Sequence, residues 1–88
     1  MHESRLVTDI LSAIEKVAET NDADYVEAVR IEIGALSHVT PDGFAGHFTM
    51  ASRGTVAEAA RLDITKSEDL DARDALDVRL VSIVTGGQ

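Results

Sequence analysis

The chain contains no cysteine and no tryptophan, and its aromatic residues are Tyr25, Phe44 and Phe48 alone. Without cysteine it has no thiolate nucleophile and cannot build a cysteine-based structural zinc site. Three aromatic side chains are too few for a base-stacking platform, and a formal net charge of -8 repels a phosphate backbone. We therefore expect neither bound zinc nor a nucleic-acid partner. The lack of cysteine also fits a cytoplasmic location.

Long apolar segments and catalytic signatures are scarce as well. The apolar runs fall far short of the roughly 20 residues that cross a membrane, and residues 1–11 lack the apolar stretch of a signal peptide. The sequence has neither a Gly-rich phosphate loop nor a nucleophile-elbow pattern around a serine. A pocket of catalytic size is hard to build in 88 residues. We expect a single domain over residues 1–88, with no enzymatic activity and no membrane segment.

Two helices are predicted from apolar periodicity. Apolar residues recur every 3.6 positions over residues 6–18, which predicts a helix of about four turns that Asn21 and Asp22 end. Thr40-Pro41 is typical of a second helix start, with the threonine as N-cap and the proline in the first turn. We expect Gly54 to be the C-cap of this second helix. Its apolar face should comprise Phe44, Ala45, Phe48 and Ala51.

Three strands are predicted from alternation. Residues 25–33 alternate apolar and polar side chains and stop at Gly34, which we interpret as a position of special backbone geometry. Residues 61–65 and 76–84 form the other two strands. In the last strand the apolar phase changes between Leu80 and Val81, which indicates a bulge.

The order of these elements predicts the topology. A strand, a helix and a strand in succession favour a parallel pair with a right-handed crossover. The last strand follows a connector of ten residues, 66–75, which is too short for a helical crossover, so it should pair antiparallel. The expected fold is α+β with two layers: a three-stranded mixed sheet with two helices on one face.

Ligand chemistry is concentrated at Met1-His2-Glu3. With His2 in the second position, the α-amine of Met1, the backbone nitrogen of His2 and its imidazole can close fused chelate rings around one metal ion. Square-planar nitrogen sets of this kind suit Ni(II) or Cu(II) rather than zinc. The alternative is that a histidine near a terminus is an ordinary surface residue. Glu3 is equally well explained as a carboxylate that complements the helix dipole.

The other two histidines differ in whether they are candidates for metal binding. His38 lies in the loop after the first strand and is a candidate for an additional metal ligand if that loop approaches the N-terminus. The alternative is a solvated loop histidine, as most loop histidines are. His47 falls at the margin of the second helix's apolar face. We interpret it as a half-buried or surface residue with no part in metal binding.

Several short segments occur in the order and spacing of one known family. They are Met1-His2-Glu3, VRIEIGALS at residues 29–37, SRGTVAE at residues 52–58 and LDI at residues 62–64. With the closing strand at residues 76–84, the chain resembles the HypA/HybF family of nickel-insertion factors for the maturation of hydrogenase and sometimes urease. The resemblance implies transient binding of Ni(II) by Met1, His2 and Glu3, with Glu3 contributing a backbone atom or its carboxylate. It implies two protein partners, a hydrogenase large-subunit precursor and a maturation GTPase.

The chain departs from that family between the last two strands. Members carry a zinc domain with paired Cys-x-x-Cys motifs there, whereas this chain has the short acidic connector at residues 66–75. Two functions follow as alternatives. The first is a nickel-binding accessory protein, or metallochaperone, for a nickel enzyme such as [NiFe]-hydrogenase. The second is a metal-independent adaptor or regulatory module in metalloenzyme assembly. The identity of the metal stays open, because Cu(II) outcompetes Ni(II) at most such sites.

Overall fold

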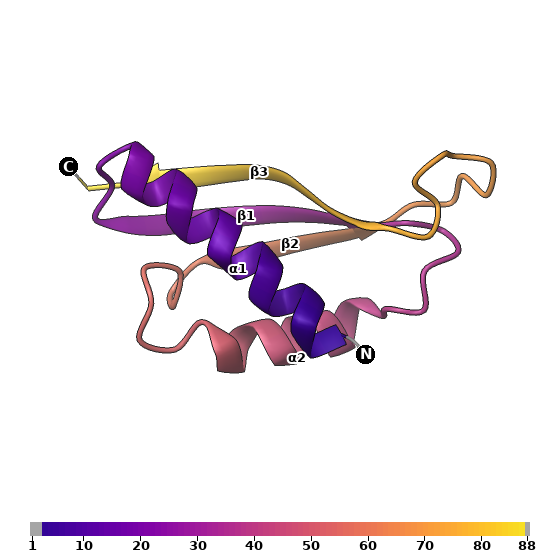
Figure 1. Ribbon diagram of the computed structural model, residues 1–88, viewed down its shortest axis with the longest axis horizontal. Helices are drawn as coiled ribbons and strands as arrows, with labels where there is room; N and C mark the ends of the chain where they lie inside the picture. Colours follow the sequence, from indigo (N-terminus) through magenta and orange to yellow (C-terminus); the bar gives the residue numbers. More distant parts are fainter. Residues whose placement is uncertain (1–2, 88) are drawn as a thin grey trace.

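A computed structural model describes residues 3–87 and shows two layers, a sheet and a pair of helices that cover one of its faces (Figure 1). This is the predicted α+β fold. The elements in chain order are α1 (Glu3–Thr20), β1 (Tyr25–Ile33), α2 (Pro41–Ala51), β2 (Arg61–Lys66) and β3 (Val78–Gly86).

The sheet has the order β2-β1-β3 and confirms the predicted pairing. β1 runs parallel to β2 and antiparallel to β3. The predicted bulge is present, since Arg30 pairs with Ser82 while Ile31 pairs with Leu80, which leaves Val81 as an extra residue on β3. The bulge keeps Leu80 and Ile83 on the same, helix-covered face. Ile31 and Ile33 of the central strand are fully buried there.

α1 is longer than predicted, with 18 residues. It buries a stripe at helical spacing and ends where Asp22 adopts a left-handed φ of 55°. In the part of the chain that the structure describes, no helix is long and apolar enough to cross a membrane. The buried residues of α1 are Val7, Ile10, Leu11, Ile14 and Ala18.

α2 starts as predicted but ends differently. The Thr40 hydroxyl accepts a hydrogen bond from the backbone nitrogen of Gly43 at 3.0 Å, so Thr40 is the N-cap. Phe44 and Phe48 are buried and their ring centroids lie 6.1 Å apart. The predictions for the helix end were wrong in two respects. The C-cap is Ser52, not Gly54, which has a φ of +79° in the following turn, and the buried face continues to Ser52 whereas Ala51 is exposed.

Gly34 is needed for a close approach rather than for a special backbone angle. A Cβ at this position would lie 2.6 Å from the backbone oxygen of Asp74 and closer still to that of Ala75. The Gly34 nitrogen donates to the Asp77 oxygen at 2.7 Å, and the Leu36 nitrogen donates to the Ala75 oxygen at 2.7 Å. The connector is therefore fastened against the end of β1 by main-chain contacts.

The connector also has different limits from those predicted. Lys66 belongs to β2, and β3 begins only at Val78, so the connector comprises residues 67–77. The closing strand extends two residues beyond the predicted end, to Gly86. There the ring of Tyr25 lies against Gly86, where a Cβ would meet the ring.

Candidate functional site

The predicted terminal ligands lie at the start of α1. Met1 and His2 are outside the described residues, and Glu3 is the first residue of α1. The described part of this region begins with Glu3 and Ser4, so the surroundings of Ser4 are what the structure shows of it.

Those surroundings include a shallow groove between the two helices. The first turn of α1 crosses α2 (Figure 1), and the groove of about 260 Å³ lies where they meet. α1 contributes its first two turns to the lining, and α2 contributes its C-terminal half. The lining residues are Ser4, Val7, Thr8, His47, Met50 and Ala51.

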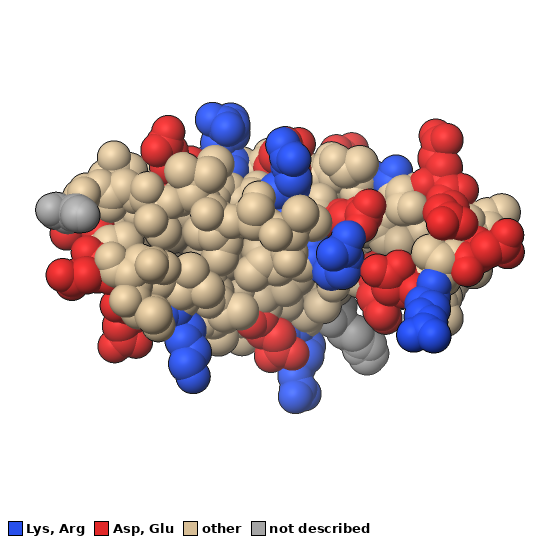
Figure 2. Space-filling view, turned by 90° about the horizontal axis from the view of Figure 1, so that it is seen from above, with Lys and Arg blue, Asp and Glu red and all other residues tan. Residues whose placement is uncertain are grey.

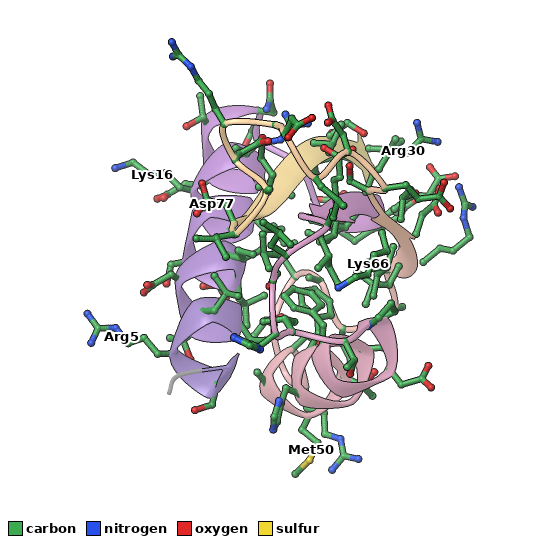
Figure 3. All side chains as sticks on the ribbon, turned by 90° about the vertical axis from the view of Figure 1, so that its right-hand side faces the viewer. Arg5, Lys16, Arg30, Met50, Lys66 and Asp77 are labelled. Carbon is green, nitrogen blue, oxygen red and sulfur yellow. The ribbon has the colours of Figure 1, made fainter. Side chains whose placement is uncertain are left out.

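His47 and Met50 bring potential metal donors to this groove. They are three residues apart on α2, so they lie one above the other on the same side of the helix. Both are exposed, and 66% of Met50 is accessible to solvent. Figure 3 shows Met50 projecting from α2 on the side away from the sheet. His47 is exposed as expected, but its position beside Ser4 was not foreseen from the sequence.

The α1 wall of the groove is polar as well as apolar. The hydroxyl of Thr8 donates to the backbone oxygen of Ser4 at 3.0 Å. Arg5 and Asp9 form an exposed ion pair at 3.8 Å, and Figure 3 shows Arg5 on the side of α1 away from α2. The groove is therefore lined by a hydroxyl-bearing turn of α1 on one side and by an imidazole of α2 on the other.

His38 lies elsewhere on the loop between β1 and α2 and is exposed. Its neighbour Ser37 accepts hydrogen bonds from the Val39 nitrogen at 3.1 Å and from Lys66 Nζ at 3.2 Å, which tie the loop to the end of β2. Among residues 3–87, no three His, Asp or Glu side chains are grouped closely enough to hold a metal ion. The structure thus brings His47, rather than His38, into a groove with the start of α1.

The uncovered face of the sheet carries exposed ion pairs. Arg30 projects from the side away from the helices (Figure 3) and pairs with Asp63 at 3.3 Å. Arg79 contacts both Glu32 and Asp74. The hydrogen bond from Arg79 to Glu32 and the charge of Glu32 raise the pKa of Arg79 above its ordinary value.

The connector end of the molecule is acidic. Figure 2 shows carboxylates gathered there. Asp69 accepts from the Asp71 nitrogen at 3.0 Å, so part of this charge supports the turn itself. The exposed side chains of Leu70 and Leu76 lie in the same segment. The connector carboxylates are Glu68, Asp69, Asp71, Asp74 and Asp77.

Comparison with known proteins gives one family. The family described as "Hydrogenase/urease nickel incorporation, metallochaperone, hypA" matches residues 1–72. This range includes the N-terminus, α1, β1, α2 and β2. Proteins named "Hydrogenase maturation factor HypA" are 38% identical over 64 residues in Methylocella silvestris and 36% identical over 66 residues in Rhizobium leguminosarum bv. viciae.

The chain covers only part of these relatives. The aligned segments amount to 73% of this chain and 57% of the M. silvestris protein, and to 75% of this chain and 58% of the R. leguminosarum protein. The fold also matches a solution structure titled as the Ni metallochaperone HypA from Helicobacter pylori, with a TM-score of 0.81 at 23% identity. That match covers 100% of both chains. A second solution structure of a HypA protein gives a TM-score of 0.78 at 22% identity and covers 100% of this chain and 98% of that one.

Proposed function

Because the chain belongs to the HypA family, we propose that it is a nickel-binding accessory protein that carries Ni(II) to the precursor of a nickel enzyme, with [NiFe]-hydrogenase as the enzyme. The observation that carries the proposal is the family match over residues 1–72, which begins at Met1. Ni(II) is the cargo of this protein, and the protein itself performs no turnover.

The proposed ligands are the first three residues. Met1 supplies the α-amine, His2 its backbone nitrogen and imidazole, and Glu3 a backbone nitrogen or oxygen. The first four N–H groups of a helix have no intrahelical acceptor, so the Glu3 nitrogen at the start of α1 is not needed to hold the helix together. Such nitrogen donors suit a square-planar Ni(II) ion. His38, exposed on its loop, is the additional ligand that the sequence proposes.

The proposed protein partners are a hydrogenase large-subunit precursor and a maturation GTPase. The relatives' name, hydrogenase maturation factor, supports a place in such an assembly. With a net charge of -8, the molecule attracts both metal cations and basic protein surfaces.

The second candidate is a metal-independent adaptor with the same fold. It is favoured by one observation, the acidic connector of residues 67–77 with exposed Leu70 and Leu76, which joins β2 to β3 in a chain without cysteine. An adaptor would bind its partner with or without nickel.

The test uses the N-terminus itself. Residues added ahead of Met1 convert its amine into an amide, and His2→Ala removes the imidazole. Calorimetric titration of the untagged protein with Ni(II) should show tight binding that both changes weaken sharply. The matched control carries the same added residues after Gln88 and should bind as the native protein does. Because the ligands lose protons on binding, affinity should rise with pH.

Equal affinity of the native and N-terminally extended proteins would refute the terminal chelate. The adaptor would then be the better explanation.

A further inference from the structure

We propose that the chain forms a symmetric dimer in which the outer edge of β3 pairs antiparallel with β3 of a second copy. The three-stranded sheets of the two copies then join into one continuous sheet. The pairing takes in the second half of the strand, residues 82–86, and its two-fold axis passes beside Val84. This inference goes beyond the proposed function and does not depend on bound nickel.

The first argument is the free edge of β3. The strand order β2-β1-β3 places β3 at one edge of the sheet, where it pairs with β1 on one side only (Figure 1). Among residues 3–87, no further strand lies beside it. Along such an edge, alternate residues direct their N–H and C=O groups away from the sheet. These groups are a template for pairing with another strand.

The second argument is that the two edges of the sheet are protected differently. Edge strands are normally kept from pairing by charged side chains, proline or a bulge. Half of β2 is charged, at Arg61, Asp63 and Lys66. β3 has a single charged residue, Arg79, and both this charge and the bulge at Val81 lie in its first half. Residues 82–86 therefore form a half-strand with no charge and no extra residue of its own.

Apolar side chains are exposed along this half-strand. Val84 and Tyr25 each leave 48% of their surface accessible to solvent. The Tyr25 ring lies against Gly86, which has no side chain of its own. On the helix-covered face, Ile83 packs against the core but is only partly buried. A second strand at this edge covers side chains on both faces of the sheet.

The charge distribution favours a second copy as the partner. Figure 2 looks onto the side of the molecule where β3 lies in Figure 1 and shows mostly uncharged surface there, with carboxylates gathered at the connector end. A basic partner is attracted to the connector rather than to the uncharged edge. In an antiparallel pair the two connectors point in opposite directions. At about 3.4 Å per residue they lie about 40 Å apart, well beyond the screening length of about 8 to 10 Å.

The two-fold axis gives each residue a defined neighbour. Val84 faces its own copy, Ile83 faces Thr85 of the second copy, and Ser82 faces Gly86 of the second copy. Pairs of β-branched side chains stabilise antiparallel strands, and no two charges oppose each other in this register. Because each copy contributes the same surface, the contact closes at two copies.

The first experiment measures the mass of the untagged full chain by sedimentation equilibrium. We expect the mass to rise with concentration from 9.4 kDa toward twice that value. Val84→Lys removes an apolar pair and places two like charges opposite each other, so it should weaken the dimer by about tenfold or more. Thr65→Lys, at an exposed position of the other edge strand, is the matched control and should leave the dissociation constant unchanged. An equimolar mixture of Val84→Lys and Val84→Glu should restore the dimer, which also shows that both variants fold.

The lack of cysteine allows a second experiment that reports position. Directly opposed residues of antiparallel strands have Cβ atoms about 4.5 to 5.5 Å apart, close to the roughly 3.5 to 4.5 Å of a disulfide. With oxidised glutathione as the oxidant, Val84→Cys should give a covalent dimer, because two thiols are oxidised to one disulfide while glutathione is reduced. Thr65→Cys should stay monomeric on a non-reducing gel.

A mass of 9.4 kDa at every concentration up to millimolar protein would overturn the proposal. So would a dimer that Val84→Lys leaves intact, or cross-linking by Thr65→Cys rather than Val84→Cys, since either result places the contact on another surface. EDTA and His2→Ala should leave the mass unchanged. Failure of the proposed function therefore shows in the nickel titration alone, and failure of the dimer shows in the mass.

Discussion

Replacing Gly34 by alanine tests the packing of the connector against the end of β1. The new Cβ would lie 2.6 Å from the backbone oxygen of Asp74 and closer still to that of Ala75. Backbone atoms cannot rotate out of the way as a flexible side chain can, so the connector has to move. This movement strains or breaks the hydrogen bonds that the nitrogens of Gly34 and Leu36 donate to Asp77 and Ala75, both at 2.7 Å.

The expected cost follows from these two effects. Forcing an extra methyl group into a packed site costs about 1 to 3 kcal/mol. Each backbone hydrogen bond lost adds about 0.5 to 1.5 kcal/mol. We therefore expect Gly34→Ala to lower the free energy of unfolding by about 2 to 6 kcal/mol. A chain of 88 residues has about 4 to 13 kcal/mol in all, so the loss is a large fraction.

Urea denaturation followed by circular dichroism measures this cost, and Gly46→Ala is its control. Gly46 lies within α2, and a Cβ there meets no atom within 4 Å. Because alanine favours a helix over glycine, Gly46→Ala should raise the free energy of unfolding by up to about 1 kcal/mol. The two substitutions add the same methyl group with opposite expected signs. A Gly34→Ala protein as stable as the native one would refute the close contact.

Ile14 is fully buried on α1, so Ile14→Ala should cost about 2 to 5 kcal/mol in urea melts, while Ser12→Ala on the exposed face should be nearly neutral. Equal costs would mean that the phase of α1 is wrong. Thr40→Ala removes the hydroxyl that caps α2 at the Gly43 nitrogen and should cost about 0.5 to 2 kcal/mol, and a neutral result would contradict the cap. Because the chain has no thiolate, thermal melts with and without EDTA should superimpose. A melting temperature lowered by more than a few degrees would instead reveal a structural metal.

The layered fold was predictable because its signals are local and periodic. The helical period of α1, the alternation of β1 and the Thr40-Pro41 start of α2 each lie within a short window of sequence. Even the bulge at Val81 was visible, since an extra residue shifts the apolar phase of a strand by one. The topology then followed from the lengths of the connections.

What failed were the features that depend on contacts between distant segments. The residues around Gly34 in the sequence do not show whether this glycine is needed for a left-handed backbone angle or for a close approach. The position of Ala75 in the structure shows that it is the close approach. The end of α2 was misplaced for a similar reason. Ser52, a polar residue, turns into the core, and its hydroxyl donates to the Thr49 oxygen at 3.4 Å, which periodicity of apolar residues cannot indicate.

The candidate site likewise has one part that the sequence indicates and another that depends on contacts between distant segments. Met1, His2 and Glu3 are adjacent in sequence, so a chelate formed by them can be proposed without a structure, and it stays a prediction. The position of His47 was not evident from the sequence, because it depends on how α2 is rotated about its axis and on which side of α2 the helix α1 lies. Phe44 and Phe48 face the core, and at about 100° per residue His47 projects about 60° from one and 100° from the other, toward one flank of α2. The crossing of α1 over that flank makes the histidine a neighbour of Ser4. A histidine that sequence alone assigns to the surface is indeed exposed, but it lies beside the first turns of α1, which sequence alone does not indicate.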